Sequence, residues 1–183
     1  MIELSLHILD IVENSIAAGA EVVDIRIQED REKDIFTIEI RDDGRGMDEQ
    51  MKKKVLDPFV TTKPRKKVGL GLSLLAEAAR KTGGRMEIHS ELDQGTHIVV
   101  TFGWSHVDRQ PLGDMIETLV LLMIGNPDVE FVYEHTRDGK SFSMDTRDIQ
   151  EHLGEIPRST PDVLDFIREH LKTGLREIGV HSQ

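Results

Sequence analysis

Residues 40–47 read Ile40-Arg41-Asp42-Asp43-Gly44-Arg45-Gly46-Met47, the end of an alternating apolar segment followed by a loop with two glycines. Asp42 would stand at the end of a strand, where its carboxylate can accept a hydrogen bond from an exocyclic amine such as that of adenine. Gly44 and Gly46 would let the backbone approach a flat ring closely. A plain turn between two elements explains these residues equally well, so the motif needs support from its neighbours.

The residues before this loop predict one helix and two strands. Apolar side chains recur at three- and four-residue spacing over residues 4–18, which predicts a helix that stops at Gly19. Residues 22–28 and 34–41 alternate between apolar and polar side chains, which is typical of strands. The polar residues 29–33 between them predict a hairpin turn.

The residues after the loop add two helices and two strands. We expect a short polar helix over residues 48–56, a basic connector over 60–68 and a helix over 69–82. Two further strands are predicted at 85–90 and 96–102. This order of elements predicts an α+β fold, a two-layer sandwich with helices on one face of a mixed, mostly antiparallel sheet.

A polar stripe on the first helix offers oxygen ligands, because His7, Asp10 and Asn14 follow one another at three- and four-residue spacing. Asparagine is unfavourable inside a helix, although a solvent-facing Asn14 is the simpler explanation when it is considered alone. As a ligand, it could hold a Mg²⁺ ion that keeps waters and nucleotide phosphates in its shell. The Asp10 carboxylate could orient or deprotonate an attacking group.

A second glycine segment, Lys67-Val68-Gly69-Leu70-Gly71-Leu72-Ser73, opens the helix predicted at 69–82. Free N–H groups and the positive end of the helix dipole suit a phosphate there. The basic residues just before it, Lys63, Arg65 and Lys66, favour the same role in an otherwise acidic chain. Each of these signals is weak by itself, since glycines before helices and solvated charge runs are common.

Five segments, in this order and spacing, resemble the motif set of the ATP-binding superfamily of histidine kinases, gyrase, Hsp90 and MutL. They are residues 10–20 (the N box, in the style of MutL), 42–46 (the first glycine box), 58–64 (the phenylalanine box of two-component histidine kinases), 69–72 (the second glycine box) and 84–96 (the hairpin that ends the kinase domain). The resemblance covers about residues 4–103 and is specific as a set. It implies ATP and Mg²⁺ as cofactors.

The resemblance also implies roles for individual residues around the base and the metal. Asn14 would hold Mg²⁺, and Asp42 would bind N6 of adenine. Gly44, Gly46 and Met47 would line the base.

Further residues would act on the phosphates. Lys63 and the loop Gly69-Leu70-Gly71 would form a mobile lid over them, and Thr96 would support Asp42 from below.

In MutL-like relatives a glutamate stands where this chain has Asp10, the candidate base. Aspartate is shorter by ~1.5 Å, and a displacement of that order can lower a rate on the order of a hundredfold. The residues therefore favour nucleotide binding over fast hydrolysis.

The expected function is an ATP- and Mg²⁺-binding regulatory protein that acts in trans, as a protein kinase or a nucleotide-gated switch. Few residues precede the first helix, and His7 lies within it, so a conventional self-phosphorylating histidine kinase is not expected. The alternatives are a slow ATPase whose lid and dimer contacts drive a cycle, and a purely non-catalytic binding module. Relatives of this arrangement imply a protein partner associated with iron-only hydrogenases, and self-association as a homodimer is a further expectation.

Composition narrows the classes of partner. The net charge of −11 argues against nucleic acid, and the densest apolar run, residues 115–124, is far short of the roughly 20 residues that span a membrane. The chain of 183 residues holds no cysteine, which fits a reducing cytoplasm.

The sequence divides into residues 1–104, the ATP-binding domain, and residues 105–183, a small acidic α/β segment. Helices are predicted at 112–124 and 161–178 in the second part, with two short strands between them. We find no pairing of nucleophile and base there, so the segment is expected to be an interaction or dimerisation element. The alternative is that it only extends the core of the sandwich.

Overall fold

The computed structural model describes residues 3–55 and 70–180. Its elements follow in the order α1 (Leu4–Ala17), β1 (Val22–Asp30), β2 (Ile35–Asp42), α2 (Glu49–Val55), α3 (Leu70–Lys81), β3 (Met86–Ser90), β4 (Thr96–Gly103), α4 (Met115–Gly125), β5 (Glu130–Arg137), β6 (Lys140–Asp145), α5 (Thr146–Leu153) and α6 (Pro161–Glu177). The whole basic connector predicted at residues 60–68, with the predicted lid residues Lys63 and Gly69, lies outside the described residues.

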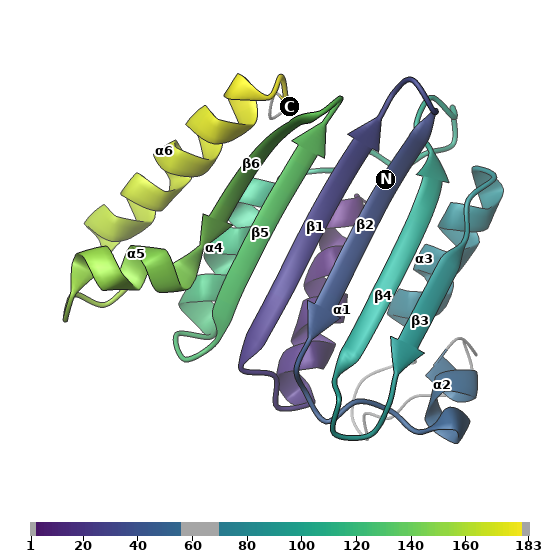
Figure 1. Cartoon of the computed structure of the whole chain (residues 1–183), viewed down its shortest axis with the longest axis horizontal. Coiled ribbons are helices and arrows are strands. Elements are labelled where there is room, and N and C mark those ends of the chain that lie inside the picture. Colours follow the sequence, from purple (N-terminus) through teal and green to yellow (C-terminus); the bar gives the residue numbers. More distant parts are fainter. Residues whose placement is uncertain (1–2, 56–69, 181–183) are drawn as a thin grey trace.

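One sheet runs through the molecule in the strand order β3-β4-β2-β1-β5-β6. Strands β1 and β5 are parallel, while the other four neighbouring pairs are antiparallel. Helices α1, α3 and α4 cover the same face of this sheet, and α6 packs beside α4 at the β6 end (Figure 1). The predicted α+β sandwich with a mostly antiparallel sheet is therefore confirmed.

The alternation in the strands explains this arrangement. Every second side chain of β1, such as Val23, Ile25 and Ile27, faces the helices and is almost completely buried. Arg26 and Gln28 point to the other face and are exposed. Helix α1 contributes a matching apolar stripe that faces the sheet. An antiparallel sheet with one covered and one solvated face has this pattern.

Residues after position 104 continue the same core instead of forming a separate one. Strand β5 pairs with β1 along its own full length, and its Phe131 and Tyr133 side chains have no exposed surface. Helix α4 packs against both α1 and α6. This segment therefore packs on the sheet of the first part of the chain, while its standing as a separate domain and its role as an interaction element stay predictions.

The start of helix α4 differs from the sequence prediction by three residues. Helix α4 begins at Met115 and not at Leu112, because Gly113 has a φ of +82° and the Asp114 carboxylate caps the helix by accepting a hydrogen bond from the Glu117 amide. Helix α6 begins at Pro161 as predicted, and the Thr160 hydroxyl before it donates to the Pro157 carbonyl and does not cap the helix.

A buried polar network joins the two parts of the chain. Both oxygens of the Glu29 carboxylate on β1 accept hydrogen bonds, one from Trp104 Nε1 at 2.8 Å and one from His135 Nε2 at 2.9 Å. An ionised carboxylate only accepts, so His135 Nε2 is the donor of that bond, and His135 Nδ1 lies 3.0 Å from the Tyr133 hydroxyl on its other side. The network ties β1, the residues after β4, and β5 together.

In the described part of the chain, no helix combines the length and apolarity that a membrane-spanning segment needs.

Replacing the carboxylate of this network should destabilise the fold. Glu29→Ala leaves the Trp104 and His135 donors without their acceptor in a buried place, which costs roughly 1–3 kcal/mol for each unsatisfied group. Denaturant unfolding of the full chain measures the loss, with Glu32→Ala in the exposed turn as control. A loss no larger than that of the control would show that the network does not join the two parts.

The pH dependence of this loss is a second readout. Burial alone would raise the pKa of Glu29, but hydrogen bonds from His135 and Trp104 outweigh it and hold the pKa below its ordinary value of 4.5. The carboxylate therefore stabilises the fold fully above pH 4.5, and this contribution disappears as the pH falls through the lower pKa of the folded state. The difference in unfolding free energy between wild type and Glu29→Ala should accordingly shrink in that acidic range.

Candidate functional site

The site is centred on Asp42, the last residue of β2, whose side chain is 7% exposed. Its Oδ2 accepts a hydrogen bond of 2.6 Å from the Ser15 hydroxyl, and its Oδ1 accepts one of 3.0 Å from the Gly44 amide. These two bonds hold the carboxylate in one orientation. A carboxylate has about four acceptor positions, so Asp42 keeps the capacity to bind a further N–H donor such as an adenine amine.

Ser15 is a residue of this site to which the sequence analysis gave no role. Its hydroxyl lies 3.3 Å from the Ile11 carbonyl as well as 2.6 Å from Asp42. The available signal is its position on the helix, because Ser15 follows the buried residues Ile8, Ile11 and Val12 at helical spacing. A buried serine on an apolar face needs a hydrogen-bond partner, and Asp42 provides it.

The loop after Asp42 is tied to the end of α1 and the start of β1. The Asp43 carboxylate accepts hydrogen bonds from the Glu21 and Val22 amides at 2.8 and 2.9 Å. The Arg45 amide donates to the Ala18 carbonyl at 3.0 Å. Asp43 therefore has a structural role, while Asp42 beside it keeps acceptor capacity.

The glycines of the loop are needed for packing within the protein. A Cβ atom on Gly46, whose φ is +64°, would lie 1.9 Å from the Glu91 carbonyl oxygen. A Cβ atom on Gly44 would lie 3.1 Å from the Ala18 carbonyl oxygen. These close backbone contacts explain why glycine occupies both positions without any bound base. The predicted place of the two glycines beside adenine stays a prediction.

The turn between β3 and β4 closes against the same loop. A Cβ atom on Gly95 would lie 2.0 Å from the Asp42 carbonyl oxygen. Thr96 stands opposite Asp42 in the β2–β4 register, but its hydroxyl lies 3.0 Å from the Ser90 hydroxyl. Thr96 therefore neighbours Asp42 through strand pairing, and no hydrogen bond joins their side chains.

The Ser90 hydroxyl also binds the backbone of Met47. Its amide donates to Ser90 Oγ at 2.9 Å, and Ser90 Oγ donates to the Gly95 carbonyl at 2.9 Å. Ser90 thus links the residue after the glycine loop to the β3–β4 turn. The sequence reasoning gave Ser90 no role.

The predicted metal and base residues lie on the exposed stripe of α1. Both Asp10 and Asn14 are exposed, one helical turn apart. A Cβ atom on Gly71 would lie 3.5 Å from Asp10 Oδ2, so the first turn of α3 starts beside the candidate base. The first N–H groups of a helix carry partial positive charge and can receive phosphate oxygens. Leu70 begins α3, and its side chain is not among those described.

The structure therefore brings together a buried carboxylate with free acceptor capacity, an exposed Asp–Asn stripe and a helix N-terminus. The first two lie on or against α1, and Gly71 places the third beside Asp10. An amine acceptor at one end and a phosphate-type helix end at the other match the parts of a nucleotide.

Comparison with protein families agrees with this arrangement. The family model described as histidine kinase-, DNA gyrase B-, and HSP90-like ATPase matches residues 2–105. This match spans more than half of the chain, and the chain belongs to this family, whose domain binds ATP.

Individual relatives share the domain but are much longer. A sensor protein of Shewanella frigidimarina is 29% identical over 112 residues, which are 58% of this chain and 16% of that protein. The sensor kinase CckA of Brucella abortus is 33% identical over 79 residues, 43% of this chain and 8% of that protein. The chain thus spans less than a fifth of the length of these relatives.

A solved structure shows the same fold. The MutL ATPase domain of Aquifex aeolicus, complexed with ADP, superposes with a TM-score of 0.52 at 16% identity, covering 92% of this chain and 88% of that one. At this identity the likeness concerns the fold. It includes the residues after position 105, because the coverage extends beyond the matched family domain.

The contact between Gly95 and the Asp42 carbonyl can be tested by adding one methyl group. Gly95→Ala should lower the free energy of unfolding by more than Gly139→Ala, which has a similar φ of +83° but open space around it. Both variants carry the strain of a left-handed alanine, while overpacking adds roughly 1–3 kcal/mol to the first alone. Denaturant unfolding measures the difference, and equal losses would contradict the close approach.

Proposed function

We propose that this chain is an ATP- and Mg²⁺-binding regulatory protein that acts in trans on a protein partner. The observation that carries the proposal is the Asp42 carboxylate, buried, oriented by Ser15 and Gly44, and still able to accept one more hydrogen bond. Membership in the ATPase family makes ATP the nucleotide expected there.

Mg²⁺ would reach the site with the nucleotide. Asn14 and Asp10 present oxygen atoms on the exposed stripe of α1, at the end where α3 begins. Magnesium usually keeps several waters and binds through one or two protein oxygens plus substrate phosphates. Asn14 is the residue proposed to hold it, and the ion would neutralise phosphate charge.

Action in trans is supported by the surroundings of His7. This side chain is only 4% exposed and lies between α1 and α3, so it is not available as a phosphate acceptor. The sensor protein and the sensor kinase to which the chain is similar match it over 112 and 79 residues. A phosphoryl group would therefore go to another protein, or ATP would act by changing how the chain binds that protein.

A slow ATPase is the second candidate, because Asp10 lies beside the first turn of α3. A carboxylate in that place could orient an attacking water. Its side chain is one carbon–carbon bond shorter than glutamate, which would make the reaction slow.

The proposed contact surface is on the residues after position 104. Leu121 and Ile124 on α4 and Phe166 on α6 are 57%, 43% and 63% exposed. A contiguous patch of exposed apolar side chains is typical of a site for another protein. Residues 105–183 hold 15 acidic and 8 basic side chains, so the partner would be basic in its contact region. A hydrogenase-associated protein and a second copy of this chain are the partners expected.

Loss of the adenine acceptor should weaken nucleotide binding. Asp42→Asn replaces an acceptor oxygen with a donor or leaves the amine unpaired, which costs roughly 1–3 kcal/mol, about a 5- to 150-fold loss in affinity. Calorimetric titration with Mg²⁺ and ATP measures it, with Asp128→Asn as an exposed control of the same charge change. Equal affinity of Asp42→Asn and wild type would show that adenine binds elsewhere.

One capture experiment distinguishes phosphoryl transfer to the partner from nucleotide-gated binding of the partner. The full chain, incubated with Mg²⁺ and either ATP or ADP, captures partners from a cell extract, and mass spectrometry then measures phosphate on them. A kinase leaves phosphate on the captured protein, whereas a switch changes the amount captured without phosphate. Action in trans would be contradicted if neither the amount of captured partner nor the phosphate on it changed with the nucleotide. The Asp42→Asn variant is the matched control.

A further inference from the structure

Two histidines stand side by side on the face of the sheet that helices α1, α3 and α4 leave open (Figure 1). His89 on β3 pairs directly with His97 on β4, so both imidazoles point to the same face. Their ring centroids are 6.0 Å apart, and the ring planes are inclined by 36°. Opposed residues of antiparallel strands have Cβ atoms about 4.5–5.5 Å apart. Rotation of the side chains alone can therefore bring both imidazoles to one ion.

Two carboxylates accompany this pair. Glu39 Oε2 on β2 lies 3.4 Å from His97 Nε2, and Glu87 Oε2 on β3 lies 3.7 Å from His89 Nε2. Both distances are longer than the ordinary N–H···O hydrogen bond, about 2.7–3.2 Å. Two ligands that each lie about 2.0–2.1 Å from a tetrahedral zinc ion are about 3.4 Å apart. The distance between His97 and Glu39 is thus long for a hydrogen bond and equal to that between two zinc ligands.

All four side chains have room to rearrange. Those of His89 and Glu87 are 66% and 44% exposed, and those of His97 and Glu39 are each 38% exposed. In the described part of the chain, no three histidine or carboxylate side chains already converge as a metal cage. The site would therefore be completed by rotation of His89 toward His97 when the ion binds.

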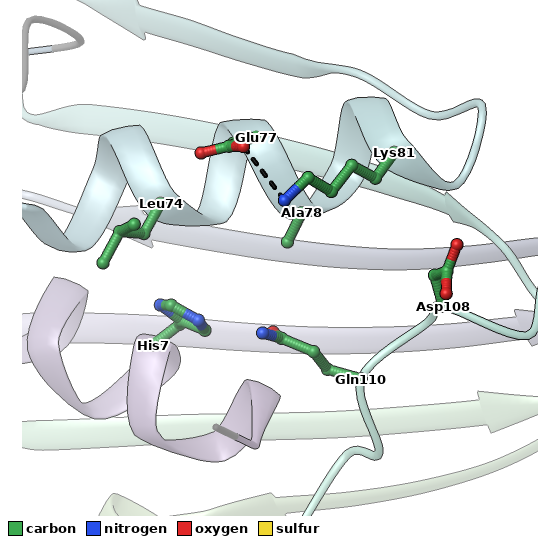
Figure 2. Close-up of a pocket in the computed structure, with 7 residues that line it drawn as sticks. All are labelled: His7, Leu74, Glu77, Ala78, Lys81, Asp108 and Gln110. Carbon is green, nitrogen blue, oxygen red and sulfur yellow. Dashed lines mark ion pairs between the residues drawn. The ribbon is translucent and has the colours of Figure 1, made fainter. Parts of the chain in front are cut away.

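The pairing of two imidazoles sets this place apart from the other histidines. Within the described ranges, His89 and His97 are the only histidines whose rings contact each other. His7 is 4% exposed and lies between α1 and α3 (Figure 2), and His135 is completely buried. Neither of these buried rings can turn toward an ion in solvent.

Two arginines modify the charge around the pair. Arg85 Nε donates to Glu87 Oε1 at 2.7 Å, and this hydrogen bond lowers the pKa of Glu87. Glu87 is therefore ionised at neutral pH, with its other oxygen on the side of His89. Arg41 stands opposite His97 in the β2–β4 register, and its positive charge opposes a bound cation.

We propose that His89, His97 and Glu39 bind one Zn²⁺ ion on the open face of the sheet. Water would complete the tetrahedral shell, and the ionised Glu87 would add negative charge. Imidazole suits Zn²⁺ and Cu²⁺, whereas Mg²⁺ prefers oxygen ligands, so the site selects against Mg²⁺. The ion would join the edge strand β3 to β4 and β2.

This ion site and the proposed nucleotide site lie on opposite faces of the sheet. Asp42 on β2 bonds to Ser15 of α1 and so faces the helices. Glu39 is three residues earlier on the same strand and therefore points the other way. The proposal does not depend on ATP binding, and its test needs no nucleotide.

The test is a titration of the untagged full chain with ZnCl₂, followed by NMR of the histidine imidazoles and by calorimetry. The signals of His89 and His97 should shift together and saturate at one ion per chain, also in excess Mg²⁺. His89→Gln and His97→Gln should each weaken binding at least about tenfold, since even outer-shell changes at metal sites cost about 10- to 100-fold. Glu39→Gln should weaken it, and Arg41→Gln should strengthen it roughly two- to fivefold.

Control variants separate this site from other histidines and from overall charge. His106→Gln and His152→Gln remove exposed imidazoles elsewhere, Glu155→Gln repeats the charge change of Glu39→Gln, and all three should leave the affinity unchanged. The proposal is overturned if the two imidazole signals do not shift saturably. It is also overturned if either His89→Gln or His97→Gln binds zinc like the wild type, or if a control variant weakens binding equally.

Discussion

The arrangement of the site depends on one buried carboxylate. Burying an ionised Asp42 is unfavourable unless hydrogen bonds replace its lost water, and the Ser15 hydroxyl and Gly44 amide replace part of it. This requirement fixes the end of β2 against the last turn of α1 and sets the course of the loop that follows. The β3–β4 turn then closes on the Asp42 carbonyl, which only a residue without a side chain, Gly95, allows.

Periodicity predicted most of the elements, because one buried face produces alternation in a strand and a three- to four-residue repeat in a helix. It could not predict the strand neighbours. The alternation of β1 shows which side chains face the helices, but nothing in it selects β5 as a parallel neighbour more than 100 residues later. That choice depends on long-range packing of α4 against α1 and on the Glu29 network.

The candidate site was predictable where side-chain chemistry determines it and less so where packing does. Asp42 stands out as a carboxylate at the end of a strand, and Asn14 and Asp10 stand out as a polar stripe within a helix. Ser15 and Ser90 were missed, since each acts through a partner distant in sequence. The loop glycines were identified for their freedom of approach, but the structure shows that the groups approaching Gly46 and Gly95 are backbone carbonyls of the protein itself.

The central claim is that ATP binds with its base at Asp42 and its phosphates between α1 and the start of α3. A crystal structure of the full chain with Mg²⁺ and a non-hydrolysable ATP analogue tests it most directly. The account predicts the exocyclic amine of adenine about 3 Å from an Asp42 carboxylate oxygen and Mg²⁺ bound to the side-chain oxygen of Asn14. A nucleotide seated on another surface, with Asp42 bonded only to Ser15 and Gly44, would contradict it.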